Sequence, residues 1–575
     1  TTPHLDRLAS EGMRFTDFYA SQAVCSASRA SLLTGCYAER VSILGALSPG
    51  SEIGLHPQEE TLAEILKARG YATGIFGKWH LGHLEESLPL QHGFDEFLGL
   101  PYSNDMWPVE YDGTRLDEGG KSHYPPLPLI DGNETVEFIE DFDGQDRLTT
   151  LYTERAVGFV ERHRKEPFFL YLAHSMPHVP LGVSDRHRGS SEQGMFGDVI
   201  QEIDWSVGEV LGALERFGLE EDTLLIFTID NRPWHNFGNH AGSAGPFREG
   251  KGTAFEGGPR VPAIMRWPGR IPAASVFPHM ASTLDILPTV ASLTGAALPQ
   301  LPIDGLDLSP ALEGHESESP RDQFLFFYGG ELRGVRVGKW KRVFQHRTRS
   351  YVGVEPGMDG LPGPYAFPTV PAALYDLQAD PAETTDLADE YPDVVARLDA
   401  LAEKAREALG DRLQGRRGAE VRPPGRSRFL RPESMGHLAV GASVSLATPP
   451  DPLYPADGGR SLTDGVLGTR DHQDGLWMGF SGDDLEAEVD LGRIQEVRLV
   501  ALDCLQAQGA WIFFPRWMEA FGSVDGETWK ELGRVDVPQQ RDGEKKSDRF
   551  EVAVVQEKGT MRYVRIQARN FGTLP

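Results

Sequence analysis

The chain has 575 residues and a formal net charge of −29, with 85 acidic side chains against 56 Lys and Arg side chains. Nucleic-acid phosphates are bound by basic surfaces, so this charge argues against a nucleic-acid partner. An anionic ligand would need a local cluster of cations against the overall field. The three cysteines cannot form a disulfide framework, and the absence of a run of 18 apolar residues predicts no membrane span.

Helix and strand patterns alternate through residues 1–410. Helices are predicted near 2–12, 57–69, 148–165, 196–217, 279–294 and 391–409, and strands near 71–76, 168–173, 224–229 and 261–265. The apolar run 168–173 predicts a fully buried strand. Residues 101–147 are rich in Pro, Gly and Asp and predict long loops, whereas 324–344 indicates a small antiparallel addition. The alternation predicts an α/β fold with a mostly parallel central sheet flanked by helices.

Composition changes after residue 410, which divides the chain into 1–410, 411–435 and 436–575. The middle segment is dense in Arg, Gly and Pro, as is typical of a linker. The last segment has short alternating strands with Asp-Gly turns, which predict an all-β sandwich. Its aromatic cluster would either stack on a sugar or fill the sandwich core or pack on the first domain, and we favour packing and assign no ligand site to Trp511, Phe513, Phe514 and Trp517.

A cysteine at position 25 stands among small residues in Val24-Cys25-Ser26-Ala27-Ser28-Arg29-Ala30-Ser31-Leu32-Leu33-Thr34-Gly35. The apolar run predicts a helix whose first N–H groups are free to bind an anion. Arg29, one turn after Cys25, would face the same site. The residues alone allow an activated thiolate beside positive charge or a buried structural cysteine, and they favour the second.

Other side chains suited to an anion or a metal follow predicted strands, where open α/β sheets place their sites. Lys78 and His80 would lie on one side of an extended chain, although a solvated lysine and a packed histidine are the simpler interpretation. Asp230 and Asn231 offer oxygens suited to Ca²⁺ or Mg²⁺, although such a pair is also common in turns. Lys251 stands in a glycine-rich loop that can approach an anion closely.

Taken in order, these motifs resemble those of the sulfatase family. Residues 25–35, Cys-x-Ala-Ser-Arg-x5-Gly, resemble its consensus Cys-x-Ala/Pro-Ser-Arg followed by a glycine, and 70–80 match its second consensus. Residues 223–231, with 239–246, resemble its metal segment, and 250–258 resemble its lysine loop. The first domain is thus similar to formylglycine-dependent arylsulfatases of the alkaline-phosphatase-like superfamily. Residues 436–575 resemble a discoidin-like, galactose-binding-like module through the phrases at 462–465, 489–492, 523–529 and 562–566.

The resemblance implies hydrolysis of an aryl or carbohydrate sulfate ester. A formylglycine-generating enzyme would convert Cys25 to Cα-formylglycine, whose hydrate attacks sulfur and is oriented by Arg29. Asp230 and Asn231 would bind Ca²⁺, with Mg²⁺ as the alternative. The substrate would be a sulfated small molecule or glycan, and the location periplasmic or extracellular, although no signal peptide is visible.

The same resemblance implies roles for the remaining candidates. Lys78 and Lys251 would bind the sulfate oxygens, with Ser103 near the formylglycine. His178 would protonate the leaving alcohol, and His80 would help to release sulfate from the sulfated diol. Ser103 is also suited to capping a loop.

Several residues depart from the family pattern or leave an alternative open. Arg232 replaces the usual glycine after Asp-Asn, where it would strain a turn of positive φ or reach the anion. Ala27 replaces a frequent proline, so maturation would depend on the host. His174 is an alternative to His178. The family's first strand, which carries an Asp-Asp pair that binds the metal, is expected upstream of Thr1, and the C-terminal module is expected to lack its last strand.

Two rival functions remain open at this stage. One is a phosphonate or phosphate monoester hydrolase of the same superfamily. The other is a catalytically silent relative that binds glycans. The added β-sandwich and Arg232 favour this second alternative. The sequence indicates neither the particular substrate nor the oligomeric state.

Overall fold

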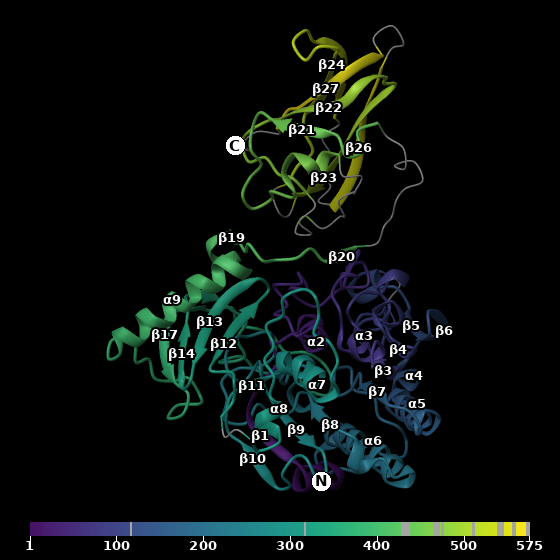
Figure 1. The fold of residues 1–575 in the computed structure, drawn as a ribbon, viewed down its shortest axis with the longest axis vertical. Helices are drawn as coiled ribbons and strands as arrows, with labels where there is room; N and C mark the ends of the chain where they lie inside the picture. The colour runs from purple at the N-terminus through teal and green to yellow at the C-terminus, as the bar shows by residue number, and fades with distance from the viewer. Residues whose placement is uncertain are drawn as a thin grey trace. The chain divides into compact units, whose positions relative to one another are not determined.

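The computed structural model describes residues 1–115, 118–315, 318–426, 438–463, 472, 477–508, 512–537, 545–554 and 559–570. The chain forms two compact units, Thr1–Ser427 and Arg428–Pro575 (Figure 1). Parts of the predicted linker and of the 462–465 phrase, together with Trp511, lie outside the described residues. Within the described ranges, none of the helices has the length and apolar character needed to cross a bilayer.

Ten strands form two sheets in the first unit: β1 (Met13–Tyr19), β3 (Ala72–Lys78), β4 (Glu96–Leu100), β5 (Leu127–Asp131), β6 (Glu134–Ile139), β7 (Phe168–Ala173), β8 (Leu225–Thr228), β9 (Arg260–Arg266), β10 (Ser275–Phe277) and β11 (Ala281–Ser282). One sheet has the order β6-β5-β4-β3-β7. The other has the order β10-β1-β9-β8, and β11 also pairs with β1.

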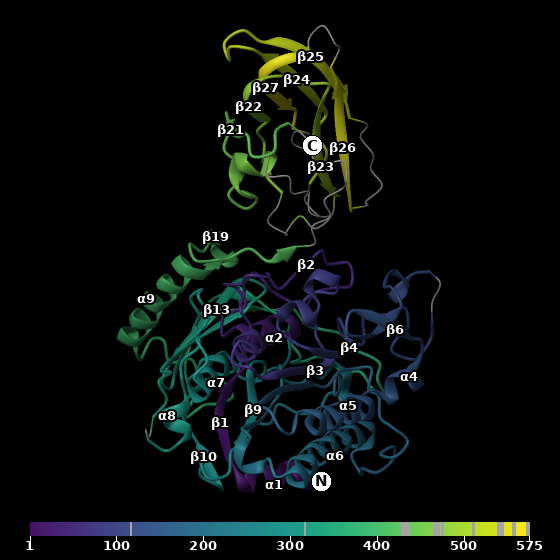
Figure 2. The same cartoon turned by 45° about the vertical axis from the view of Figure 1, so that its right-hand side comes forward.

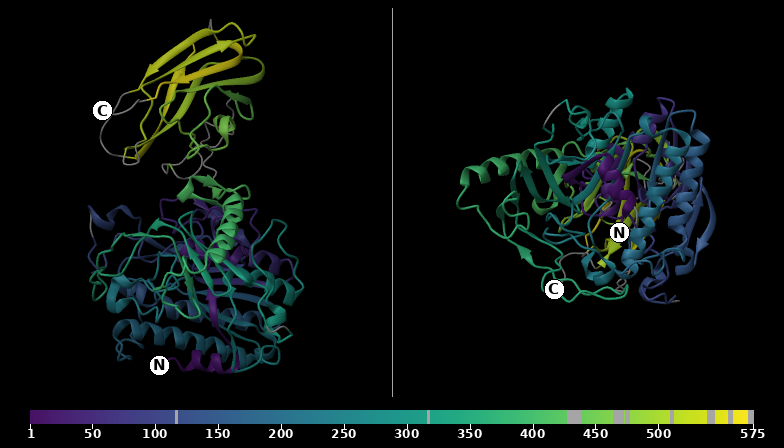
Figure 3. Two further views of the ribbon diagram at one scale, coloured as in Figure 1. Left: turned by 90° about the vertical axis from the view of Figure 1, so that its left-hand side faces the viewer. Right: turned by 90° about the horizontal axis from the view of Figure 1, so that it is seen from below.

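Helices surround these sheets, as the sequence predicts: α1 (Pro3–Glu11), α2 (Cys25–Thr34), α3 (Leu62–Lys67), α4 (Phe142–Asp146), α5 (Leu148–His163), α6 (Gly194–Phe217), α7 (Ile286–Thr294), α8 (Ser309–Leu312) and α9 (Pro392–Leu409). α5 packs on β3 and β7, and α6 lies beside α5 (Figure 2). α6 also runs next to α1 (Figure 3), where Asp204 accepts hydrogen bonds from the free backbone N–H groups of His4 and Leu5 at 3.1 and 2.8 Å.

The sheets are mixed, because some neighbours of the parallel strands run the other way. β3 is parallel to β4 and β7, and β1 is parallel to β10 and β11. β9 is antiparallel to both β1 and β8. The segment between β8 and β9 contains only the short 3-10 helix His235–His240, so the chain returns without the helical crossover that a parallel partner needs.

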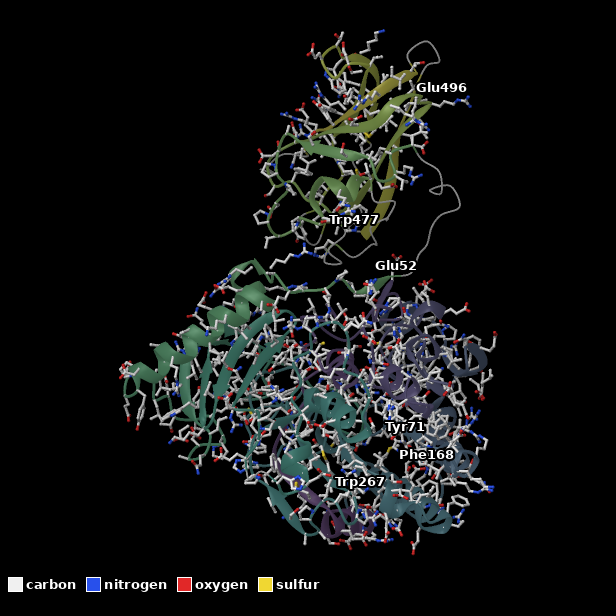
Figure 4. The ribbon with its side chains drawn as sticks, in the orientation of Figure 1. Glu52, Tyr71, Phe168, Trp267, Trp477 and Glu496 are labelled. Carbon is white, nitrogen blue, oxygen red and sulfur yellow. The ribbon has the colours of Figure 1, made fainter. Side chains whose placement is uncertain are left out.

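Two local predictions were wrong. Residues 101–147 are not only loops, since β5 and β6 form a hairpin around a two-residue Gly132-Asn133 turn whose signal the composition masked. The side chains of β7 are half-buried, apart from the buried Ala173, rather than fully buried. β7 lies at the edge of its sheet in the described part of the chain, and all side chains of the edge strand β8 are half-buried too. Phe168, the first residue of β7, lies near Tyr71, which precedes β3 (Figure 4).

An antiparallel sheet completes the first unit in the order β12-β13-β14-β17, with α9 packed on β13 and β14: β12 (Gln323–Tyr328), β13 (Glu331–Val337), β14 (Trp340–Val343) and β17 (Ala373–Asp376). Short two-stranded ribbons are β2 (Ile53–Gly54) with β20 (Gly425–Arg426), β15 (His346–Arg347) with β16 (Thr369–Val370), and β18 (Gly410–Asp411) with β19 (Arg416–Arg417).

The second unit is all-β. Its strands are β21 (Ser443–Leu446), β22 (Leu485–Glu496), β23 (Leu499–Ala507), β24 (Trp517–Ser523), β25 (Lys530–Asp536), β26 (Lys545–Ala553) and β27 (Thr560–Ala568). They form an antiparallel sheet β21-β22-β27-β24-β25 and a pair β23-β26. Phe514 lies in the core against Phe550, with ring centroids 5.2 Å apart, as we expected for this aromatic cluster. Trp517 is half-buried beneath Arg534.

Candidate active site

Cys25 is the first residue of α2, directly after the turn that follows β1. Val24 precedes it with extended backbone and without a side-chain cap, so the first N–H groups of the helix are free for an anion. The side chain is buried, with 2% of its surface exposed. The lysine loop is attached here, because the Gly252 N–H donates to Ala23 O at 2.9 Å.

Positive charge surrounds the Cys25 sulfur. Lys251 Nζ lies 3.7 Å from Cys25 Sγ. Burial alone would raise the pKa of Cys25, but the charges of Lys251 and Lys78, with smaller contributions from the neighbouring His178 and His80, hold it well below its usual range. The environment therefore stabilises negative charge at position 25.

Lys251 also contacts His178, with 2.7 Å between Nζ and Nε2. His178 Nδ1 lies 2.7 Å from Val179 O, so that nitrogen carries the proton and Nε2 accepts from Lys251. The Asn104 amide fixes this segment by donating to the carbonyls of His178 and Pro180 at 3.3 and 3.1 Å. The imidazole and the ammonium group are thus held together beside the nucleophile.

Lys78 reaches the site from the end of β3. Its Nζ donates to Ser103 Oγ at 3.2 Å, and both side chains are buried. Burial lowers the pKa of Lys78, while the Cys25 charge opposes that effect. An incoming anion would favour the charged ammonium in the same way.

His80 lies against the same sulfur in a strained backbone conformation, with φ of 64°. Such a conformation costs about 1–3 kcal/mol for a residue with a side chain. His80 Nε2 lies 2.8 Å from Leu47 O, and burial, followed by the charge of Lys78, lowers the pKa of the ring. The ring is therefore neutral near pH 7 and able to accept a proton.

Asp230 and Asn231 follow β8 and meet Arg29. Arg29 Nε lies 3.0 Å from Asp230 Oδ2, and Arg29 Nη1 donates to Lys78 O at 2.5 Å. The Asn231 amide donates to Asp230 Oδ1 at 2.8 Å and lies 3.9 Å from Cys25 Sγ. All nine predicted site residues therefore converge on one region of the first unit.

The oxygens of Asp230 and Asn231 fit a hard cation in chemical type but not in number. Ca²⁺ takes about 6–8 oxygen ligands. Among the residues that the structure describes, no group of three or more His, Cys, Asp or Glu is placed to hold a metal ion. These residues alone do not complete a metal site.

Two alternatives from the sequence are resolved by position. Arg232 does not have a positive φ, and its guanidinium turns away to the Arg260 carbonyl and lies 5.1 Å from the Phe247 ring centroid. It neither strains the turn nor reaches the anion site. His174 faces α6, with Nε2 3.0 Å from Ser206 Oγ, and burial lowers its pKa to about 4.

Sequence reasoning missed two residues at the site. The Asp105 carboxylate lies 3.9 Å from His178 Nδ1, and although burial raises its pKa, His178 and a hydrogen bond from Ser103 leave that pKa lowered. The Trp234 ring centroid lies 4.5 Å from Lys251 Nζ and 5.6 Å from the His178 ring centroid. Asp105 lies two residues after Ser103, so the motif around Ser103 could have indicated it. Nothing in the sequence distinguishes Trp234 from the other tryptophans.

A buried nucleophile position lined with cations at strand ends is the site of a hydrolase that acts on an anionic ester. Residues 1–296 match the sulfatase family, and residues 319–421 match the C-terminal region of aryl-sulfatase. The chain belongs to the sulfatase family. It is a sulfuric ester hydrolase.

Individual relatives agree with this assignment. Arylsulfatase A of Bos taurus is 41% identical over 415 residues, covering 68% of this chain and 80% of its own length. N-acetylgalactosamine-6-sulfatase of Canis lupus familiaris is 37% identical over 439 residues, covering 71% and 81%. The crystal structure of PsFucS1 sulfatase from Pseudoalteromonas sp. has a TM-score of 0.62 and 26% identity, covering 70% of this chain and 84% of that chain. The fold is therefore alkaline-phosphatase-like, with the all-β unit following it.

The charge around residue 25 predicts that the Cys25 thiol is ionised. Cys25 should be a thiolate at pH 7, because its pKa lies well below the usual range, whereas burial raises the pKa of Cys36 to about 11. Ultraviolet titration of the thiolate absorbance checks this. Cys25→Ala should remove the absorbance at pH 7 and Cys36→Ala should retain it. A Cys25 signal that appears only above about pH 8.5 would contradict the prediction.

Proposed function

We propose that Cys25 is converted to Cα-formylglycine and that its hydrate supplies the nucleophilic hydroxyl for attack on the sulfate ester. The observation that carries the proposal is the convergence of Lys78 and Lys251 on a buried position where negative charge is stabilised. The free N–H groups at the start of α2 add to this field. A sulfuryl group that gains charge in the transition state suits such a site.

Each neighbouring side chain then has a chemical task. Lys78 and Lys251 bind the sulfate oxygens, and Ser103 supports Lys78 through the hydrogen bond of 3.2 Å. His178, which shares a proton with Lys251 across 2.7 Å, delivers that proton to the leaving alcohol oxygen. Neutral His80 accepts the proton of the hydroxyl at position 25.

Arg29 and Asp105 position this machinery. Arg29 links the first turn of α2 to Lys78 O and to Asp230, so it ties the nucleophile to two strand ends. The Asp105 carboxylate lies 3.9 Å from His178 Nδ1 and helps to orient that ring. Neither residue needs to touch the reacting sulfur.

We also propose that Asp230 and Asn231 are part of a divalent cation site, with Ca²⁺ preferred and Mg²⁺ the alternative. The bound cation would neutralise charge on the sulfuryl oxygens. The donor types support the proposal, since carboxylate and amide oxygens directly after β8 are ligands that a hard cation prefers.

The proposed partners follow from the chemistry. The substrate is a sulfated small molecule or glycan, and a formylglycine-generating enzyme matures Cys25. The proposed location is periplasmic or extracellular, where such esters occur. Residues 436–575 are proposed to be a galactose-binding-like module without an assigned ligand.

Maturation is tested by mass spectrometry of the Cys25 peptide from the native host. The side chain –CH₂SH should be replaced by –CHO, and sulfate release should depend on the fraction replaced. The Cys36 peptide, from a cysteine outside the site, serves as the internal control. An unmodified Cys25 thiol in active protein would rule out the formylglycine proposal.

Proton delivery by His178 predicts a dependence on the leaving group. His178→Ala should lower kcat for a sugar sulfate by about 10²–10⁴-fold, because its alkoxide needs a proton. The loss should be much smaller for 4-nitrophenyl sulfate, whose phenolate leaves readily. His174→Ala should lower both rates alike, if at all. Equal losses in His178→Ala on the two substrates would exclude the role.

Residues 1–575 should bind Ca²⁺ weakly, because the described site offers the oxygens of only Asp230 and Asn231. Calorimetric titration of this chain should give a Kd weaker than about 10⁻⁴ M. Asp230→Ala should abolish the residual binding, whereas Asp359→Ala, in a surface loop, should not. Tight stoichiometric binding would contradict the ligand count.

A further inference from the structure

An arginine of the antiparallel ribbon lies beside the sulfate-binding lysine. Arg349 follows β15, whose pairing with β16 is extended by a bridge between Ser350 and Ala366. A Cβ added to Gly252 would lie 3.0 Å from Arg349 Nη1. Gly252 is the residue after Lys251, so the guanidinium reaches the backbone of the lysine loop.

Aromatic rings enclose this guanidinium. Arg349 Cζ lies 4.4 Å from the ring centroid of Tyr365 and 6.0 Å from that of Trp234. Trp234 Nε1 donates to the Tyr365 hydroxyl at 2.6 Å, which fixes the two rings together. Trp234 is the same ring that contacts Lys251 and His178, so one indole connects Arg349 to the groups proposed to bind sulfate and protonate the leaving oxygen.

Among the described residues, Arg349 forms no ion pair with a carboxylate. Burial lowers the pKa of Arg349, whereas Tyr328, Tyr365 and Tyr351 raise it, and Tyr351 is also its hydrogen-bond partner. In contrast, Arg333 on β13 pairs with Glu331 at 2.8 Å. A chain with 85 acidic residues and 56 Lys and Arg does not lack carboxylates to pair with. A partly buried guanidinium that is hydrogen-bonded to a tyrosine but not ion-paired is suited to an anion from outside.

We propose that Arg349, together with Trp234, binds a second oxyanion carried by the alcohol part of the sulfate ester. The inference rests on the proposed function of Lys251 and His178, which places the scissile sulfate. The ester oxygen at His178 directs the alcohol part past the Trp234 ring to the guanidinium. The second group is a sulfate or a carboxylate, both of which match a guanidinium in shape. The enzyme would thus select doubly anionic substrates.

The test compares kcat/KM for a monosulfated hexose, the same hexose with a second sulfate, and a monosulfated hexuronate. Wild-type enzyme should have a higher kcat/KM for at least one of the two doubly anionic esters. The preferred ester then shows whether the second anionic group is a sulfate or a carboxylate. Arg349→Gln should reduce that preference by about 10- to 100-fold, as for loss of a charge-assisted hydrogen bond. Arg349→Lys should retain part of it. Arg347→Gln, an exposed arginine of the same ribbon, should leave the preference within about twofold.

Two outcomes would overturn the inference. In one, wild-type enzyme shows no preference in kcat/KM for a doubly anionic ester. In the other, Arg349→Gln lowers kcat/KM equally on all three esters, as expected if Arg349 only supports Tyr351. If no ester is hydrolysed, the proposed function fails, and the subsite is then tested by binding alone. Calorimetry with the disulfated hexose and the Cys25→Ala protein should show weaker binding after Arg349→Gln. Unchanged binding would exclude the subsite.

Discussion

The structure depends on the concentration of positive charge around a single buried atom, the sulfur of Cys25. Lys78 and Arg29 are each more than nine-tenths buried within a few side chains of one another, in a protein of net charge −29. Burying like charges together is costly unless an anion or a nearby carboxylate compensates them. Asp230 compensates Arg29, while Lys78 and Lys251 remain for the substrate. The folded protein tolerates this energetic cost, and an anionic ester therefore meets cationic side chains that are already in position.

The antiparallel sheet of the first unit holds the lysine loop in position. Lys341 on β14 is fully buried, and its Nζ donates to Ala254 O at 2.8 Å. The same ammonium pairs with Glu256 at 3.0 Å and with Glu383 at 2.8 Å. These carboxylates come from different parts of the chain, so their shared cation fastens the loop to the sheet. The position of Lys251 thus depends on residues more than eighty positions further along the chain.

The sequence was most informative where a feature is local. Long amphipathic helices such as α5, α6 and α9 were predicted to within a few residues, because their periodicity is set by the chain itself. Cys25 and Lys78 were found because each stands in a local motif. Local patterns could not show that β7 is an edge strand, since that depends on which strand lies next to it. Trp234 was missed for the same reason, because its importance comes from side chains that are distant in sequence.

The burial of Cys25 has a consequence for the order of events during synthesis. Only 2% of its surface is exposed once Lys251, His178 and His80 have closed around it. A modifying enzyme cannot reach a side chain that is this deeply buried unless the surrounding structure unfolds. The lysine loop, in turn, is fastened only after β14 has been made. The interval between the emergence of Cys25 and the completion of β14 is therefore the period in which the proposed conversion would meet an accessible side chain, and folding that runs ahead of it would leave an unconverted, buried thiolate at the site.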